Sequence, residues 1–226
     1  MKNKIFITGT DTGIGKTMIS MLLMRQLFKQ GKTPFYFKPF QTGCRDVWDT
    51  DSDAKFVYES VKELKAIDPN DSLGICLPNP KAPLFAARDA GVKINFQEIL
   101  NNLPEGNPLV LEGAGGLLVP LDDKHTTIDF IKAVIPQVVL VARAGLGTIN
   151  HTLLSLNLLK QNGIYDVSVV YVDLLDTDEQ MIQENMEAIK LFSGIEVCGI
   201  IGKIENLENP DAGIESVMEG LVDSFN

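Results

Sequence analysis

The sequence predicts an α/β fold in which a mostly parallel sheet is flanked by helices on both faces. Short apolar runs rich in β-branched residues alternate with longer stretches whose apolar residues recur at helical spacing. The apolar runs are continuous rather than alternating with polar residues, which is typical of strands buried on both faces. The 226 residues contain no internal repeat, low-complexity tract or linker, so we expect a single domain over residues 1–226.

The N-terminal elements follow from local patterns. Residues 5–8 form an apolar run and predict the first strand. Residues 18–30 carry apolar side chains three and four positions apart and predict a helix, which Gly31 can end. Residues 34–38 predict the second strand, and residues 53–65 predict a helix because their apolar residues share one face.

The middle of the chain is less regular. Asp51 or Ser52 is the best candidate to cap the second helix. Residues 67–92 contain many Pro, Asn and Gly residues and are expected to be loop. Residues 95–102 predict a helix, and residues 109–112 form a short apolar strand that stops at a run of glycines.

Strands and helices alternate regularly in the C-terminal half. Residues 137–142 (QVVLVA) form the clearest buried strand, and residues 148–161 follow as a helix. Residues 167–172 predict another strand, residues 178–192 another helix, and residues 197–201 a last strand. Strands joined by helices in this way run parallel, because each helix returns the chain to the same edge of the sheet.

Composition and charge argue against several classes of function. The formal net charge is −10 and the isoelectric point about 4.7, a field that repels nucleic acid and anionic membranes. The cysteines Cys44, Cys76 and Cys198 form no CxxC pair, so neither a disulfide framework nor a zinc site is indicated. No apolar run reaches the length of a membrane span, and the first strand begins without a signal peptide. We expect a cytoplasmic protein without nucleic-acid or membrane partners.

Residues 9–17, GTDTGIGKT, lie between the first strand and the helix after it. Ligands of parallel sheets bind at this end of the strands. Gly13 and Gly15 allow the backbone to approach an anion closely, and the helix N-terminus adds partial positive charge. Lys16 would reach the outer phosphates of a nucleotide, and the Thr17 hydroxyl would coordinate Mg²⁺. The pattern predicts phosphate binding; the alternative is a capped helix start that contains Gly-Lys-Thr by chance.

Charged residues at two further strand ends could complete this site. Lys38 could stabilise charge on a transferring phosphoryl group, or it could be a solvated surface lysine. A carboxylate among Asp49, Asp51 and Asp53 could bind Mg²⁺, directly or through water. Glu112 ends an apolar strand, where an unpaired charge would be costly. With the loop threonine, one aspartate and this glutamate would form a hard oxygen shell suited to Mg²⁺.

Two other junctions could bind a substrate. Thr42 and Gly43 follow the second strand and could hydrogen-bond a polar substrate or simply form a turn. Residues 145–150, GLGTIN, form a second glycine-rich junction between strand and helix, which could receive an anion such as a carboxylate or be an ordinary turn. His125 and His151 have no metal-ligand partner at useful spacing, so we interpret them as structural or surface residues.

Together these segments resemble the dethiobiotin synthetase family. They are GTDTGIGKT at 9–17, KPFQTG at 38–43, DSDA at 51–54, EGAGG at 112–116 and GTINH at 147–151. They occur in this order and at these separations in that family, and the resemblance runs from about residue 4 to about residue 204. The combination is highly specific, although each segment alone is not. It implies a P-loop NTPase fold.

The resemblance implies an ATP-dependent ligase of biotin synthesis that closes a cyclic urea on 7,8-diaminononanoate with CO2. One amine adds to CO2 to form a carbamate, whose oxygen attacks the γ-phosphate of ATP. The other amine then attacks the mixed anhydride and expels phosphate, which gives dethiobiotin and ADP. Because carbamate and triphosphate are both anionic, their approach requires the positive charge of Lys16, Lys38 and Mg²⁺. Phosphoryl transfer relies on positioning and charge neutralisation, so we expect no nucleophilic side chain.

The resemblance also implies roles for individual residues. Lys38 and Lys16 are the expected catalytic lysines. The expected nucleotide site comprises Gly13, Ile14, Gly15, Lys16, Thr17, Met18, Asp53, Glu112, Gly113, Ala114, Gly115, Asp173, Gly202 and Lys203. The expected magnesium ligands are Thr17, Asp53 and Glu112. The expected substrate contacts are Thr12, Lys38, Thr42, Gly147, Thr148, Ile149 and Asn150. The family is a homodimer in which the helix start after Gly147 receives the substrate carboxylate across the interface.

The sequence departs from the family pattern in three places. Asp173 stands at the strand end where an asparagine usually reads adenine. The later adenine-side segment usually contains proline but here reads GIIGK at 199–203. These two differences leave the nucleotide preference open. In the loop 80–87, Leu84 stands where a histidine is common.

The alternative is a nucleotide-switch ATPase of the partition or metal-insertion type. Such proteins usually carry a second lysine near the start of the loop, where this chain has Asp11. They often need an amphipathic membrane tail or a basic DNA face, and residues 214–226 are short and acidic. A relative that binds nucleotide without catalysis is a further alternative, but the expected lysines, threonine and glutamate are all present. The synthetase is the favoured interpretation.

Overall fold

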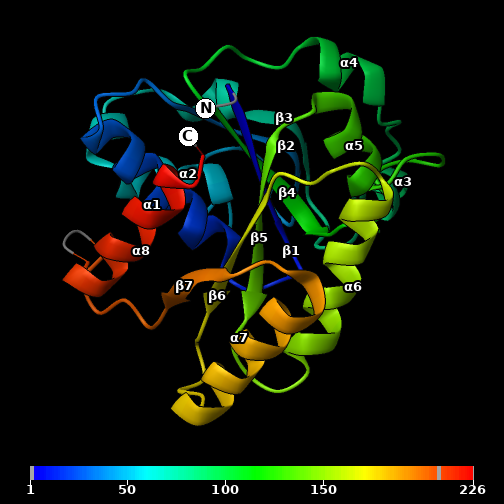
Figure 1. Ribbon diagram of the computed structural model, residues 1–226. Helices are drawn as coiled ribbons and strands as arrows, with labels where there is room; N and C mark the ends of the chain where they lie inside the picture. Colours follow the sequence, from blue (N-terminus) through cyan, green and yellow to red (C-terminus); the bar gives the residue numbers. More distant parts are fainter. Residues whose placement is uncertain (1–2, 208–209, 226) are drawn as a thin grey trace.

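The computed structural model describes residues 3–207 and 210–225. In this part of the chain seven parallel strands form one sheet in the order β3-β2-β4-β1-β5-β6-β7 (Figure 1). The strands are β1 (Lys4–Gly9), β2 (Phe35–Thr42), β3 (Leu73–Leu77), β4 (Leu109–Gly116), β5 (Gln137–Arg143), β6 (Val167–Val172) and β7 (Val197–Ile201). The expected α/β fold with a parallel sheet is confirmed.

Helices cover both faces of the sheet (Figure 1). One face is covered by α1 (Lys16–Lys29), α2 (Asp53–Ser60) and α8 (Ala212–Asp223). The other is covered by α3 (Pro83–Asp89), α4 (Phe96–Asn101), α5 (Thr127–Val134), α6 (Thr148–Gln161) and α7 (Glu179–Ser193). Among the described residues, no helix combines the length and the apolarity that crossing a bilayer requires.

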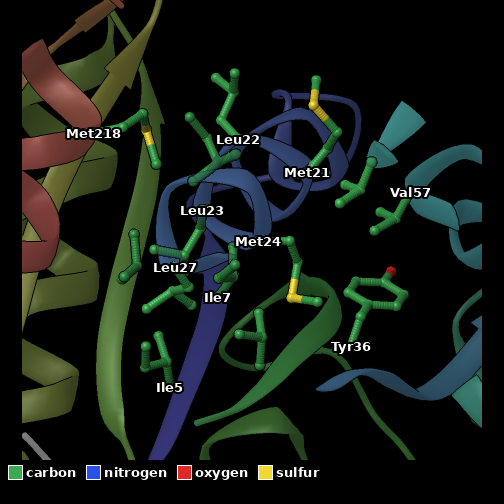
Figure 2. Packing of buried hydrophobic residues seen from close by; sticks show 14 of the residues in the cluster. Ile5, Ile7, Met21, Leu22, Leu23, Met24, Leu27, Tyr36, Val57 and Met218 are labelled. Carbon is green, nitrogen blue, oxygen red and sulfur yellow. The ribbon is translucent and has the colours of Figure 1, made fainter. Parts of the chain in front are cut away.

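Alternation along β1 divides its side chains between the two faces. Ile5 and Ile7 are fully buried under α1, whereas Phe6 belongs to the cluster on the opposite face. Figure 2 shows Leu23 and Leu27 of α1 lying over the β1 isoleucines. Burying large side chains on both faces fixes the position of β1, and with it the loop that follows its carboxyl end.

Several predicted boundaries are wrong. Residues 67–92 are not only loop, because they contain a short 3₁₀ turn (Pro69–Ser72), the edge strand β3 and helix α3. Pro83 begins α3 at a position where proline is favoured, so a residue that suggested a break instead starts a helix. The helix predicted at 53–65 ends at Ser60, and a 3₁₀ turn (Lys62–Leu64) follows.

Two predicted strands are too short. β2 continues through Lys38 to Thr42, and β4 continues through Glu112 to Gly116. Both charged residues therefore lie inside strands rather than at their ends. They can do so because the two charges compensate each other, as the geometry of the site shows.

Candidate functional site

The loop between β1 and α1 has the backbone features of an anion-binding surface. Gly13 (φ +69°) and Gly15 (φ +94°) have left-handed backbone conformations. A Cβ built on Gly15 would lie 3.0 Å from Cγ1 of Val172, so a larger residue would push the loop away from β6. The first turn of α1 has neither a side-chain cap nor an acidic residue, so its amides can bind a phosphate.

Lys16 lies at the start of α1 and is buried. Its Nζ donates a hydrogen bond to the main-chain oxygen of Asp11, 2.8 Å away, and so closes the loop on itself. Burial lowers the pKa of Lys16 to about 8, although Glu112 opposes the shift. A polyphosphate would replace the carbonyl as its partner and favour the charged form.

Four elements bring four polar side chains into one cluster. Lys38 of β2 forms ion pairs with Oδ2 of Asp53 and with Oε1 of Glu112, the second at 2.8 Å. Thr17 of α1 places its Oγ1 2.8 Å from Oδ1 of Asp53 and 2.9 Å from Oε1 of Glu112. The hydroxyl has one proton and can donate to only one of the two oxygens at a time. At any moment one of these two carboxylate oxygens therefore faces the Thr17 oxygen without a proton between them.

This donor set fits Mg²⁺ bound together with a nucleotide. Thr17, Asp53 and Glu112 each present one oxygen to the same point. No group of three or more His, Cys, Asp or Glu side chains suited to a metal occurs within residues 3–207 and 210–225. Magnesium rarely needs such a group, because it binds through one or two carboxylates and takes further ligands from phosphates and water.

Electrostatics within the cluster favour its charged state. Burial alone would lower the pKa of Lys38, but Glu112 and Asp53 outweigh it and raise this pKa above its ordinary value. Burial opposes ionisation of Asp53, and Lys38 overcomes it, so the pKa of Asp53 is lowered. Lys38 is therefore a permanent cation beside the cavity, and Asp53 stays an anion.

A cavity of about 460 Å³ opens over the cluster. Many of the predicted nucleotide, metal and substrate residues line it: Thr12, Gly13, Gly15, Lys16, Thr17, Lys38, Thr42, Asp53, Glu112, Ala114 and Gly115. The Ile14 side chain is instead buried in the core, so a phosphate contact from this residue would come from its main chain. The cavity therefore joins the predicted phosphate, metal and diamine positions.

Other predicted nucleotide residues lie outside this cavity. Met18 packs against the core, and Gly113 lies in β4, where a Cβ would come within 2.9 Å of Phe6. Asp173 follows β6, and its carboxylate accepts hydrogen bonds from N and Oγ1 of Thr177 at 2.9 and 2.8 Å. Its backbone amide donates a hydrogen bond to the carbonyl oxygen of Ile201, the last residue of β7.

Gly202 and Lys203 come directly after β7. They thus lie beside Asp173, on the side of the glycine-rich loop where Val172 packs against Gly15. Their role in nucleotide binding stays a prediction.

The predicted carboxylate site also lies apart from the cavity. Gly147 is the residue before α6 and has φ +89°, while Thr148, Ile149 and Asn150 form the first turn. Thr148 is fully buried, whereas Asn150 is exposed. None of residues 147–150 lines the cavity of its own chain, so their role in substrate binding stays a prediction.

Sequence reasoning missed three polar residues near the cluster. Gln41 accepts a hydrogen bond from the Asp53 amide at 3.2 Å, which fixes the start of α2. Ser20 and Tyr36 both reach Glu112 from the buried side. The signal for Ser20 was its position four residues after Lys16, on the same helix face. Ser52 caps α2, so Ser52 rather than Asp51 is the capping residue.

The lowered pKa of Lys16 predicts a pH dependence of nucleotide binding. ADP is fully ionised above about pH 7, and binding it favours the charged lysine. Affinity for ADP should therefore fall as the pH rises above about 8, by up to about tenfold per pH unit, with proton uptake on binding. Titration calorimetry from about pH 7 to about pH 9.5 measures both. The Lys16→Arg variant, which keeps its charge, should show no such fall; a constant affinity for the parent protein would contradict the prediction.

Comparisons with known proteins agree with this geometry. A family model described as an AAA domain matches residues 3–211. The ATP-dependent dethiobiotin synthetase BioD of Paramagnetospirillum magneticum is 35% identical over 197 residues, which cover 87% of this chain and 86% of the relative. The protein of the same name from Methanocaldococcus jannaschii is 35% identical over 213 residues, covering 90% and 96%.

Solved structures show the same fold at low identity. The MinD cell division protein of Aquifex aeolicus has a TM-score of 0.57 and 14% identity, covering 98% of this chain and 97% of that protein. A putative plasmid partition protein of Borrelia burgdorferi has a TM-score of 0.56 and 16% identity, covering 99% and 97%. At these identities the likeness shows the fold alone.

Proposed function

The chain belongs to the ATP-dependent dethiobiotin synthetase family, and from this premise we propose that it closes the ureido ring of dethiobiotin from 7,8-diaminononanoate, CO2 and ATP. It is thus an ATP-dependent ligase. The observation that carries the proposal is that Lys16, Lys38, Thr17, Asp53 and Glu112 meet at one cavity. Two cationic groups at this cavity suit a reaction between two anions.

The charges of the site suit each step of this reaction. Lys16 and the amides of the first turn of α1 would hold the outer phosphates of ATP. Lys38 lines the same cavity as this loop and Thr42, and the carbamate would lie beside it. Its charge would offset the repulsion as a carbamate oxygen attacks the γ-phosphorus and ADP leaves. The second amine then forms the C–N bond as phosphate leaves.

Magnesium completes this proposal. Thr17, Asp53 and Glu112 would hold Mg²⁺, which would neutralise charge on the β- and γ-phosphates. The diamine would lie against Thr12 and Thr42, which also line the cavity. Residues 1–226 would act as one domain in the cytoplasm, with no nucleic-acid or membrane partner, consistent with a net charge of −10.

A phosphate-release assay tests the proposal. Purified protein receives Mg²⁺, ATP, bicarbonate and 7,8-diaminononanoate, and phosphate is followed with and without the diamine. Release that depends on the diamine, with dethiobiotin formed in equal amount, is the expected result. Slow phosphate release at the same rate with and without the diamine would indicate a nucleotide switch instead. Asp11, which pairs with Arg143 at 3.0 Å, argues against that alternative, because such switches usually carry a second lysine at this position.

We propose that two chains share the substrate site. Leu146, just before α6, is 87% exposed, and Leu154 on the same helix is 61% exposed. Exposed leucines beside Gly147–Asn150 suit an interface between two copies of the chain. The α6 N-terminus of one copy would then receive the substrate carboxylate held by the other.

Leu154→Glu should separate the two chains. A charge buried in an interface is unfavourable, so sedimentation should show monomers at micromolar concentration. The KM for the diamine should rise at least about tenfold, because the carboxylate loses its helix N-terminus. Leu191→Glu is the matched control, since Leu191 is also exposed but lies in the last turns of α7. A dimeric, fully active Leu154→Glu variant would refute the shared site.

A further inference from the structure

Glu112 is fully buried, and its two oxygens have separate sets of partners. Oε1 faces the cavity, where it contacts Nζ of Lys38 at 2.8 Å and Oγ1 of Thr17 at 2.9 Å. Oε2 faces the protein interior, where it accepts hydrogen bonds from Oγ of Ser20 at 2.7 Å and from Oη of Tyr36 at 3.0 Å. The two oxygens are thus chemically distinct, although a free carboxylate would interchange them by rotation.

Each interior donor shares its element with a residue of the cavity. Tyr36 and Lys38 are two residues apart on β2, so both point to the same face of the strand. Ser20 is three residues after Thr17 on α1, which places both on one face of the helix. The strand and the helix therefore each supply one group to Oε1 and one group to Oε2 of the same glutamate.

Surrounding packing fixes both interior donors. The Tyr36 ring lies in the apolar cluster beside Met24 and Val57 (Figure 2), and the whole residue is fully buried. Ser20 is also fully buried; its Oγ lies 3.0 Å from the Lys16 carbonyl but only 2.7 Å from Oε2. Its single proton goes to the carboxylate, because charged acceptors form the shorter and stronger hydrogen bonds.

We propose that Ser20 and Tyr36 are positioning residues, which hold Oε2 of Glu112 so that only Oε1 is presented to the metal and to Lys38. The inference rests on the proposed role of Glu112 as a magnesium ligand. Without these two donors the carboxylate can rotate, bind the metal through both oxygens, or pair more closely with Lys38. Partners of this kind behind a metal ligand change metal affinity by about 10- to 100-fold.

Metal binding to the protein–ADP complex tests the proposal directly. The probe is Mn²⁺, whose free and bound forms are distinguished by electron paramagnetic resonance. Tyr36→Phe and Ser20→Ala should each weaken Mn²⁺ binding about tenfold, and the double variant about 100-fold. ADP affinity without metal should stay within about twofold of that of the parent protein, since neither side chain lines the cavity. The Mg²⁺ concentration for half-maximal activity should rise in parallel, while kcat at saturating Mg²⁺ falls less.

Tyr58→Phe is the matched control. Tyr58 is a buried tyrosine of the same apolar cluster, but it lies on α2 and makes no contact with Glu112, so its loss should leave Mn²⁺ binding unchanged. Thermal unfolding identifies variants that are not folded; Tyr36→Phe keeps the ring and therefore the packing. Unchanged Mn²⁺ affinity in folded Tyr36→Phe and Ser20→Ala, or an equal loss in Tyr58→Phe, would overturn the proposal.

The two proposals fail separately. If phosphate release depends on the diamine but substitution of Ser20 and Tyr36 leaves Mn²⁺ affinity unchanged, the synthetase function stands and the positioning role is wrong. If the diamine has no effect but the variants lose Mn²⁺ affinity, the positioning role stands for a metal–nucleotide site of another reaction.

Discussion

Replacing Lys38 by alanine should lower kcat by about two to three orders of magnitude while ADP still binds. Lys38 lies on the cavity wall and keeps its charge, since its pKa is raised by Glu112 and Asp53. Its loss removes a cation from the point where carbamate and γ-phosphate meet, but leaves Lys16 and the glycine-rich loop intact. Steady-state kinetics and a nucleotide-binding titration measure the two effects.

The matched control is Lys190→Ala. Lys190 is an exposed lysine that also forms an ion pair with a carboxylate, Glu196, but it lies on α7 far along the chain from the site. Its loss should leave kcat and unfolding temperature nearly unchanged, as is usual for surface ion pairs. Full activity of Lys38→Ala would show that phosphoryl transfer does not use this cation.

Replacing Glu112 by alanine should reduce the free energy of unfolding by about 3–5 kcal/mol. The change leaves the buried Lys38 with Asp53 as its remaining carboxylate. It also leaves the hydroxyls of Ser20 and Tyr36 without their acceptor in the interior. Denaturation by urea, followed by circular dichroism, measures the loss.

Glu112→Gln separates charge from shape in the same experiment. It keeps an acceptor oxygen and the volume of the side chain, so it should lose less stability than the alanine variant. Both variants should lose metal-dependent activity, because each removes a charged magnesium ligand. A loss below about 1 kcal/mol in Glu112→Ala would mean that the carboxylate does not organise the cluster.

The sequence predicted the bounds of helices and strands best where the local residue pattern matches the burial of the element in the fold. β6, β7 and α6 have the predicted bounds, because their apolar residues are continuous or at helical spacing and glycines or polar residues flank them. The predictions end β2 and β4 too early, at Lys38 and Glu112. A charged residue after an apolar run normally marks the end of a buried strand. These two residues are suitable for the interior only because they form an ion pair across neighbouring strands.

A similar difference separates the site residues that the sequence predicted from those that it missed. The glycine-rich loop pattern predicted Lys16 and Thr17. Lys38 and Glu112 were predicted because strand ends converge at the carboxyl edge of a parallel sheet. Ser20 and Tyr36 were missed because a serine in a helix and a tyrosine in a strand fit ordinary packing. Their importance follows from which oxygen of Glu112 they contact, and a local pattern does not contain that distance.

Oxygen transfer tests the central claim most directly. When a carbamate oxygen attacks the γ-phosphorus, that oxygen leaves with the phosphate as the ring closes. With ¹⁸O-labelled bicarbonate and short reaction times, mass spectrometry should therefore find one labelled oxygen in each phosphate released. Phosphate that takes its new oxygen from water would show simple ATP hydrolysis, and would contradict a site that brings carbamate and triphosphate together between Lys16 and Lys38.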